Sequence, residues 1–197
     1  ESVRGVHAMD RLSGRTYRYE APAVVNAAGP WSRTLAGKYH KDFPELFRPS
    51  LAWNLLLDRP ALSDHALAVC PRKNEGHTYF LVPWQGKIFA GTGHVPTTWT
   101  PDSPIHPSDE QIDGFLTDLN DAVPELTLKM SDIVHVHAGL LPTKKSGEAQ
   151  LAVREVIVDH GRRGGPIGLY SVSGIKFTTA RLVAEKILRL IENSSFS

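Results

Sequence analysis

The chain has 197 residues, of which 41% are hydrophobic and 22% charged, so its composition is that of one large or two small globular domains and excludes a disordered or fibrous chain. Lysine and arginine number 22 against 21 acidic residues, and the net charge of +1 excludes the global basic field of a nucleic-acid-binding protein. The single cysteine, Cys70, excludes an internal disulfide. We therefore expect a cytoplasmic protein.

The first predicted element is a β-hairpin. Its arms are Val3 to Met9 and Thr16 to Tyr19, with the turn at Ser13 and Gly14. The hairpin begins without any element before it, so we expect the chain to be a fragment of something longer.

Between residues 23 and 93 the chain is a succession of predicted strands. Ala23 to Val25 is a short buried strand that runs into a loop of small residues. Residues 51–58 form the next strand, and residues 78–82 and 87–93 form the two arms of a hairpin. No helical pattern separates these strands, which predicts a largely antiparallel sheet in the middle of the chain.

Prolines at 96, 101, 104 and 107 predict an extended connection, and a helix follows it. Ser108 and Gln111 match the capping box, and Pro124 ends the helical pattern. The apolar residues between these points recur at helical spacing: Ile112, Phe115, Leu116, Leu119 and Val123. We expect this helix to cover one face of the sheet.

The segment DIVHVHAGLLP is the next predicted strand. Its alternation puts Val134, Val136 and Ala138 on one face and Ile133, His135 and His137 on the other. The two histidines are a candidate metal pair, but no third ligand stands at a useful spacing. Half-exposed strand histidines are the preferred interpretation.

The last third predicts two strands and a helix. The strands are REVIVDH and GLYSV, joined through GRRGGPI, which is interpreted as a hairpin tip with two solvated arginines. The helix carries an apolar stripe that consists of Ala180, Val183, Ala184, Ile187 and Ile191. Thr178 or Thr179 is the expected N-cap.

The turn between this last strand and the helix, SGIKFTT, has the composition of an anion site. Free amides and the helix dipole at a helix N-terminus form a seat for negative charge. Gly174 permits close approach of a ligand to the backbone, and Lys176 adds a full positive charge. A solvated lysine at a helix start is the alternative interpretation of Lys176.

Four segments now point to a family: VVNAAGPWS, YFLVPWQGKIFAGTGHVP, DIVHVHAGLLP and LYSVSGIKFTTARLVAEKI. In order and spacing they resemble the C-terminal part of FAD-dependent glycerol-3-phosphate dehydrogenases, within the D-amino acid oxidase-like family of FAD-dependent oxidoreductases. The resemblance implies an α+β fold, with a largely antiparallel or mixed substrate domain, flanking helices and remnants of a Rossmann-like FAD domain. It places FAD-domain strands at residues 1–44, the substrate domain at 45–143 and the return to the FAD domain at 144–197.

The resemblance also implies a function, the transfer of hydride from a small polar substrate such as glycerol 3-phosphate to flavin N5. The implied FAD-binding residues are Ala28, Gly29, Pro30 and Trp31 in one loop and Gly174, Ile175, Lys176, Phe177 and Thr178 in another. Lys176 is in addition a catalytic candidate. The GxGxxG half that binds most of the cofactor is absent from the chain and is its expected partner, so we predict that the isolated chain binds FAD weakly or not at all and is inactive.

Three positions carry the substrate expectations. The family's G-T-T-D is GTGH here, which gives His94, a candidate acid/base because an ordinary histidine pKa of ~6.5 suits proton transfer. The family's G-V-R-P is GLLP here, so Leu141 replaces an arginine and removes a bidentate anion clamp. Arg154 matches another family arginine and is expected to bind a phosphate or carboxylate. The structural alternatives are an exposed loop histidine and a surface strand arginine.

Three function classes stay open. The first is the flavin dehydrogenase or oxidase, with an amino or hydroxy acid as the alternative substrate. The second is a non-catalytic flavoprotein-like binding module, and the third, ranked last, is a metal-dependent enzyme that uses the histidines. Peripheral contact with the cytoplasmic membrane is expected only by analogy with the glycerol-phosphate enzymes. Trp31, Trp53 and Trp84 are interpreted as packing residues before ring-stacking ones.

Overall fold

The structure is a computed structural model that describes residues 1–73, 77–148 and 150–195. The chain folds as two compact units. The first consists of Glu1–Arg48, Pro142–Ser146 and Gln150–Ser197, and the second of Pro49–Leu141 with Gly147–Ala149. The divisions at 48/49 and 141/142 lie near the boundaries expected after residues 44 and 143. The assignment of the units to cofactor and substrate stays a prediction.

A three-stranded sheet organises the first unit. Its order is β3 (Val24–Asn26), β10 (Leu169–Ser173) and β9 (Val156–Asp159). The central strand β10 runs antiparallel to β9, as the predicted hairpin of the last two strands requires, and parallel to β3, a pairing that was not predicted. Every residue of β10 is buried, because a central strand covered on both faces leaves no side chain in water.

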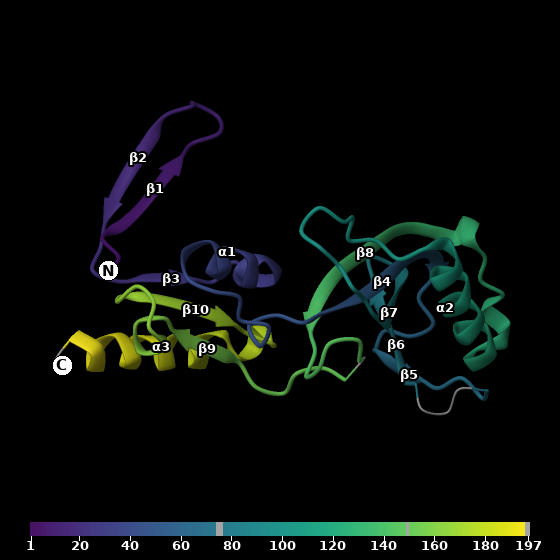
Figure 1. Cartoon of the computed structure of the whole chain (residues 1–197). Coiled ribbons are helices and arrows are strands. Elements are labelled where there is room, and N and C mark those ends of the chain that lie inside the picture. Colours follow the sequence, from purple (N-terminus) through teal and green to yellow (C-terminus); the bar gives the residue numbers. More distant parts are fainter. Residues whose placement is uncertain (74–76, 149, 196–197) are drawn as a thin grey trace. The chain divides into compact units, whose positions relative to one another are not determined.

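Helices cover both faces of this sheet (Figure 1). On one face Ala36 of α1 (Ser32–Tyr39) packs in a cluster with Val158, and on the other α3 (Ala180–Ser195) packs Val183 and Ile187 against Val172. The predicted stripe on α3 was therefore too wide, because Ala180 and Ala184 are exposed. Helix α1 was not predicted.

The N-terminal hairpin is confirmed. Strands β1 (Gly5–Met9) and β2 (Thr16–Glu20) pair antiparallel, with Gly5 opposite Glu20. Gly5 has φ of +142°, and a Cβ there would lie 1.9 Å from the carbonyl oxygen of Tyr19, so only glycine fits the start of this hairpin.

The second unit is the predicted antiparallel sheet, and the expected α+β class is confirmed. Its order is β5-β6-β7-β4-β8. The strands are β4 (Pro49–Pro60), β5 (Leu67–Val69), β6 (Tyr79–Trp84), β7 (Lys87–Pro96) and β8 (Ile133–Pro142). Strand β4 pairs antiparallel with β7, β7 with β6, and β6 with β5. Strand β5 was not predicted.

Helix α2 (Asp109–Ala122) covers one face of this sheet, as predicted. The Ser108 side chain accepts from the Gln111 amide at 3.2 Å, and the Gln111 side chain accepts from the Ser108 amide at 2.9 Å, which completes the capping box. Four residues of α2 enter the core with the sheet residues: Ile112, Phe115, Leu116 and Leu119. Trp53 is buried in the same core, which confirms its packing role.

The predicted alternation of β8 is wrong at its first two residues. Ile133 packs on the core together with Val136 and Ala138, whereas Val134 is exposed. The strand emerges directly from a 3-10 turn at Met130–Asp132, so its regular alternation begins only after Val134. His135 and His137 share the opposite face as expected, with ring centroids 4.4 Å apart.

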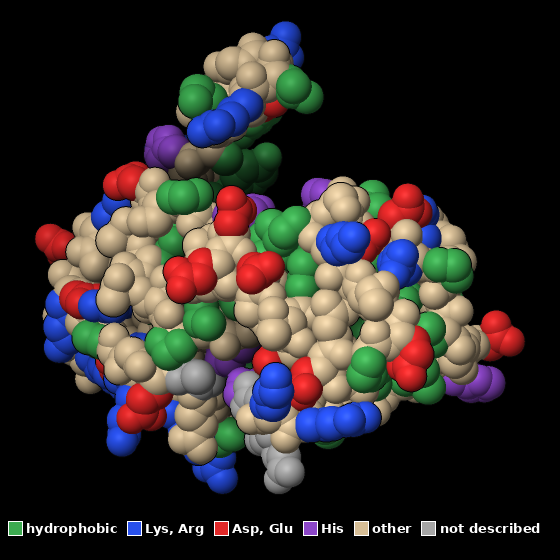
Figure 2. All heavy atoms as spheres, turned by 90° about the vertical axis from the view of Figure 1, so that its right-hand side faces the viewer, with side chains coloured by type: hydrophobic (Ala, Val, Ile, Leu, Met, Phe, Trp, Pro, Cys, Tyr) green, Lys and Arg blue, Asp and Glu red, His purple; other side chains and the backbone are tan. Residues whose placement is uncertain are grey.

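The remaining short elements are 3-10 turns: η1 (Gly29–Trp31), η2 (Pro124–Leu126), η3 (Met130–Asp132), η4 (Gly161–Arg163) and η5 (Phe177–Thr179). Figure 2 shows basic and acidic side chains interspersed over the face that it presents, in keeping with a net charge of +1. None of the described helices has the length and apolar character needed to cross a bilayer.

Candidate cofactor and substrate site

The loop after β3 begins with a buried side chain and then becomes exposed. Asn26 is 6% exposed, whereas Ala28, Gly29 and Trp31 are exposed and Pro30 is half-buried. Gly29 adopts φ of +57°, a left-handed backbone conformation that glycine reaches without steric strain, and the η1 turn starts there. The loop therefore exposes small side chains and backbone groups, while the buried Asn26 anchors its start.

A cavity of about 590 Å³ lies beside this loop within the first unit. It is lined from β1, β3, α1 and β10, and its walls include Asn26, Ala27 and Ala28. Strand β3 pairs only with β10 among the described strands, so its second edge lies open next to the cavity. The cavity and the open edge together form an unfilled side of the first unit.

The turn that opens α3 is bare. Strand β10 is buried through Ser173, and then Gly174, Lys176, Phe177 and Thr178 are exposed while Ile175 is half-buried. Phe177 is 97% exposed, which is unusual for a large apolar side chain on a surface that contacts only water. A Cβ at Gly174 would meet nothing within 4 Å, so the backbone there is open to a ligand.

Thr179 directly precedes α3, where the N-cap was expected, but its hydroxyl makes a different hydrogen bond. Helix α3 is preceded by η5, whose N-cap residue Lys176 makes no side-chain cap hydrogen bond. The Thr179 hydroxyl donates to the Lys176 carbonyl at 3.0 Å instead of accepting from an amide. A threonine that does not cap leaves the positive end of the helix for another acceptor.

Arg154 lines a pocket of about 240 Å³ in the first unit, and the pocket is cationic. Arg48 and Lys144 line it as well, and Ser173 and Ile175 bring the α3 turn to its wall. The structure thus brings Arg154 and the predicted flavin-facing turn together. Glu45, also in the wall, is paired with Arg163 at 2.8 Å, so its charge is already compensated.

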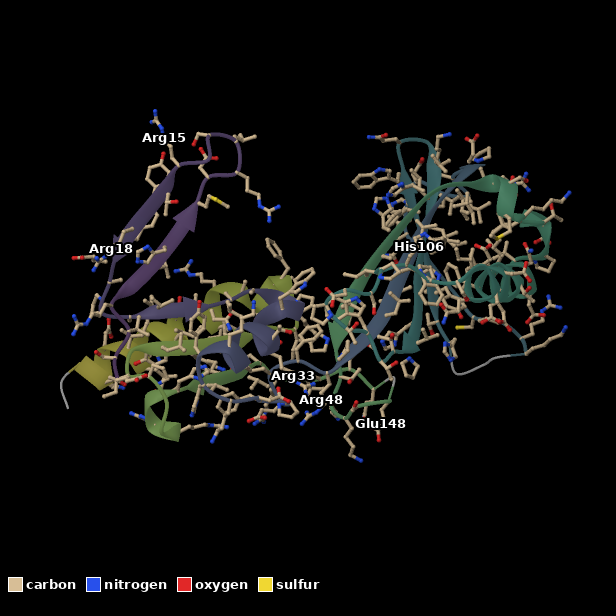
Figure 3. All side chains as sticks on the ribbon, turned by 45° about the horizontal axis from the view of Figure 1, so that its top comes forward. Arg15, Arg18, Arg33, Arg48, His106 and Glu148 are labelled. Carbon is tan, nitrogen blue, oxygen red and sulfur yellow. The ribbon has the colours of Figure 1, made fainter. Side chains whose placement is uncertain are left out.

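Hydrogen bonds hold the cationic pocket in shape. Arg48, labelled in Figure 3, is the last residue before β4, and its guanidinium donates to the Lys144 carbonyl at 2.9 Å. The Thr143 amide and hydroxyl both donate to the Arg48 carbonyl, at 2.9 and 3.1 Å. Arg48 and Lys144 were not predicted as site residues, because no motif joins positions so far apart in the sequence.

His94 and Leu141 belong to the second unit, where Ser50 joins them. Ser50 Oγ donates to the Leu141 carbonyl at 3.0 Å, and it lies 2.7 Å from His94 Nε2. Since the serine has one hydrogen, His94 Nε2 carries the proton of its bond to Ser50, and Nδ1 is left as the proton-accepting nitrogen. Burial, with a smaller effect of His77, lowers the pKa of His94. His94 is half-buried on strand β7, so the alternative of an exposed loop histidine is wrong.

The histidine pair on β8 is the candidate metal pair of the sequence. No group of three or more histidine, cysteine, aspartate or glutamate side chains converges among residues 1–73, 77–148 and 150–195. His135 and His137 are exposed strand residues whose rings meet edge to face, and the His137 ring also contacts Phe89.

In the first unit a helix-covered sheet ends in an exposed glycine turn at a helix start, and this arrangement is typical of nucleotide-cofactor-binding proteins. The particular family follows from sequence. The family model described as FAD dependent oxidoreductase (DAO) matches residues 1–190, and the chain belongs to that family. The resemblance inferred from the four segments is confirmed, and FAD is the cofactor of the family.

The chain is similar to mitochondrial glycerol-3-phosphate dehydrogenases. It is 28% identical over 187 residues to that of Macaca fascicularis, covering 93% of this chain and 25% of the relative. It is 29% identical over 216 residues to that of Schizosaccharomyces pombe, covering 98% of this chain and 32% of the relative. The chain thus spans a third or less of the length of these two proteins.

A solved structure shares the fold. The glycerol-3-phosphate dehydrogenase from Bacillus halodurans, complexed with FAD, superimposes with a TM-score of 0.75 at 28% sequence identity. The match covers 98% of this chain and 36% of that one.

The residues of the first unit fit a flavin nucleotide. The open backbone at Gly174, the exposed Phe177 and Lys176 beside it, and the cavity next to Ala28 offer donors and space of the kind such a cofactor needs. The individual FAD contacts of Ala28 to Trp31 and of Gly174 to Thr178 stay predictions.

Proposed function

We propose that this chain supplies the substrate-anion pocket and the flavin-facing turn of an FAD-dependent glycerol-3-phosphate dehydrogenase. The observation that carries the proposal is the cationic pocket of Arg48, Lys144 and Arg154, whose wall includes Ser173 and Ile175 of the α3 turn. A dianionic phosphate is the substrate group that three cations around one small pocket suit best.

The chain's own groups have distinct parts in this proposal. Arg154 and Lys144 bind the phosphate, and Arg48 holds the Lys144 loop in place while adding its charge. The amides from Gly174 to Thr178 and the Lys176 ammonium present positive charge to the cofactor, and a preorganised donor of this kind is worth about 3 to 4 kcal/mol. Bound FAD supplies the hydride acceptor.

His94, in the second unit, is proposed as a proton acceptor. Its Nδ1 has the free valence for a proton, because Nε2–H is committed to Ser50. Burial keeps the ring neutral near neutral pH, as a proton acceptor must be. Leu141 contributes its carbonyl to this arrangement and no charge.

The test is the kinetics of this chain loaded with flavin together with a polypeptide that bears the GxGxxG half. The variants are Arg154→Gln, Arg154→Lys and the control Arg15→Gln, which changes an arginine in the N-terminal hairpin (Figure 3). Loss of a charge-assisted bond worth about 1.5 to 3 kcal/mol should raise KM for glycerol 3-phosphate roughly 10- to 100-fold in Arg154→Gln. Arg154→Lys should recover part of this loss, and Arg15→Gln should change nothing.

Substrates separate the competing functions. Turnover of a 2-hydroxy or amino acid without turnover of glycerol 3-phosphate would replace the phosphate assignment by the carboxylate alternative. Bound flavin that no substrate of either kind reduces would favour the non-catalytic module.

The location is also a proposal. We place the protein in the cytoplasm with peripheral membrane contact, on the grounds of its exposed free Cys70 and of the analogy with glycerol-phosphate enzymes. Cell fractionation that finds it in another compartment would end this part of the proposal.

A further inference from the structure

A buried chain of polar groups links the loop after β3 to the surface of the first unit. His160 is fully buried, with Nε2 2.9 Å from the hydroxyl of Ser171 and Nδ1 3.3 Å from Nδ1 of His40. The Asn26 amide nitrogen donates to Ser171 Oγ at 3.0 Å and to the Ser32 carbonyl at 2.9 Å. Asn26, Ser32 and Ser171 are buried as well, whereas His40 is only half-buried.

One arrangement gives every donor and acceptor in this series of polar groups a partner. The Ser32 carbonyl requires the NH2 group of Asn26 to face it, and that group also donates to Ser171. Among the hydrogen bonds of the described residues, the hydroxyl hydrogen of buried Ser171 has one acceptor within reach, Nε2 of His160. In this arrangement His160 is neutral with its proton on Nδ1, from which it donates to Nδ1 of His40. The reversed arrangement, in which Nε2–H donates to Ser171, would leave the buried hydroxyl hydrogen without an acceptor.

The far end of the chain holds the loop. With its NH2 group turned to Ser32 and Ser171, Asn26 points its oxygen at the loop, where it accepts from the Ala28 amide at 3.3 Å. Asn26 and Ala28 both line the cavity of about 590 Å³. The orientation of His160 is thus transmitted through Ser171 and Asn26 to the loop of small residues.

The surroundings of His160 oppose a positive charge on it. Burial comes first, then the neighbouring His40, and Arg163 adds to them; Asp159 acts in the other direction, and the balance lowers the pKa of His160. Phe43 closes one side with its ring edge-on at 5.2 Å. The His40 ring packs on Gly165, where a Cβ would lie 2.5 Å from His40 Nδ1.

We propose that His160 is the positioning residue of the Asn26–Ala28 loop and that it works only as the neutral Nδ1–H tautomer. A second proton would put a hydrogen on Nε2, facing the hydrogen of Ser171, and the serine would lose its acceptor. Ser171 would turn, Asn26 would lose a partner, and the loop would loosen. This positioning role of His160 does not depend on the proposed function. A further role of the loop in facing FAD would rest on it.

The sign of the pH dependence follows from the lowered pKa of His160. The unfolded chain takes up the proton near its ordinary value of 6.5, whereas the folded chain resists it to a lower pH. The contribution of neutral His160 is therefore complete above pH 6.5 and is lost as the pH falls through the folded pKa.

Two measurements on the flavin-free chain test the proposal. The 15N shifts of the His160 ring should report a neutral Nδ1–H tautomer at pH 7. Hydrogen exchange of the Ala28 amide, corrected for its intrinsic rate, should then accelerate about tenfold or more from pH 7 to pH 5. The neutral variant His160→Gln should keep the loop but lose this pH step, whereas the control His65→Gln, at an exposed site, should keep the step.

An Nε2–H tautomer at pH 7, or a pH step that persists unchanged in His160→Gln, would overturn the proposal. The tautomer measurement needs only the unmodified chain, so it decides even if a variant fails to fold. Neither measurement involves flavin or substrate, so a failure of the proposed function would leave this result standing, and the reverse also holds.

Discussion

His94 shows how one serine hydroxyl can decide the chemistry of a neighbouring ring. Ser50 donates its one hydrogen to the Leu141 carbonyl. The hydrogen bond between Ser50 and His94 must therefore use a hydrogen on Nε2 of His94. Had the residue at position 50 lacked a hydroxyl, the ring would be free to adopt either tautomer. The sequence reveals His94 as a departure from the family pattern, but its partner stands 44 positions earlier and carries no motif.

We expect the neutral form of His94 to be the active one in the flavin-loaded protein. Burial lowers its pKa below the ordinary 6.5, so kcat/KM should hold at neutral pH and fall about tenfold per pH unit once the pH drops below the His94 pKa. The variant His94→Gln should lower kcat roughly 10²- to 10⁴-fold and lose this acid limb.

Two comparisons give this pH profile its meaning. The phosphate of the substrate titrates as well, but its contribution is common to both profiles, so the difference between wild type and His94→Gln belongs to the histidine. A profile of His94→Gln with the same acid limb and a full kcat would contradict the role of His94.

At the scale of elements, α2 is the one whose start, end and buried face all follow from local sequence. Ser108 and Gln111 satisfy each other's backbone groups, and the apolar stripe packs on the sheet. Ser108→Ala removes the acceptor for the Gln111 amide and should lower the free energy of unfolding by about 1 kcal/mol. Urea unfolding measures the change, with Thr117→Ala on the exposed face of the same helix as the control.

A loss in Ser108→Ala no larger than that in Thr117→Ala would show that the capping box adds nothing to stability.

Elements without such local signals escaped prediction. Helix α1 has eight residues, two of them buried, and its sequence SRTLAGKY carries no side-chain cap, so packing on β10 and β3 decides its conformation. Strand β5 has three residues and pairs only with β6 among the described strands. The first residues of β8 were assigned to the wrong faces because the 3-10 turn before them sets the phase of the strand.

The residues of the candidate site also divide into those that the sequence revealed and those that only the structure shows. The resemblance supplied Arg154 and the turn from Gly174 to Thr178, because these lie in segments that can be compared with a family. Arg48 and Lys144 complete the cationic pocket through a hydrogen bond between positions 96 apart. The contact of Asn26 with Ser171 joins positions 145 apart. Partners at such separations become visible only once the chain is folded.

At the scale of the whole molecule, the chain covers 36% of the Bacillus halodurans protein that was solved with FAD, so most of that protein's chain has no counterpart here. We expect a GxGxxG half to pack on the open edge of β3 and the cavity beside it. We therefore expect the purified 197-residue chain to bind FAD weakly or not at all. The visible absorbance of the purified chain, after dialysis with excess FAD, measures this.

A stoichiometric flavin spectrum would show that the turn and the loop of the first unit suffice. If no such spectrum appears, the chain should retain flavin only after a separately produced polypeptide with a GxGxxG fold is added.

The first unit is assembled from both ends of the polypeptide, with the second unit inserted between them. Strand β3 is synthesised before the second unit and its partner β10 after it, so the second unit is made before β10 appears. Since domains fold as they emerge, the inserted sheet with α2 should reach its native state first. Until β10 is made, β3 has no partner strand in its sheet, and that interval is when chaperones would be needed most.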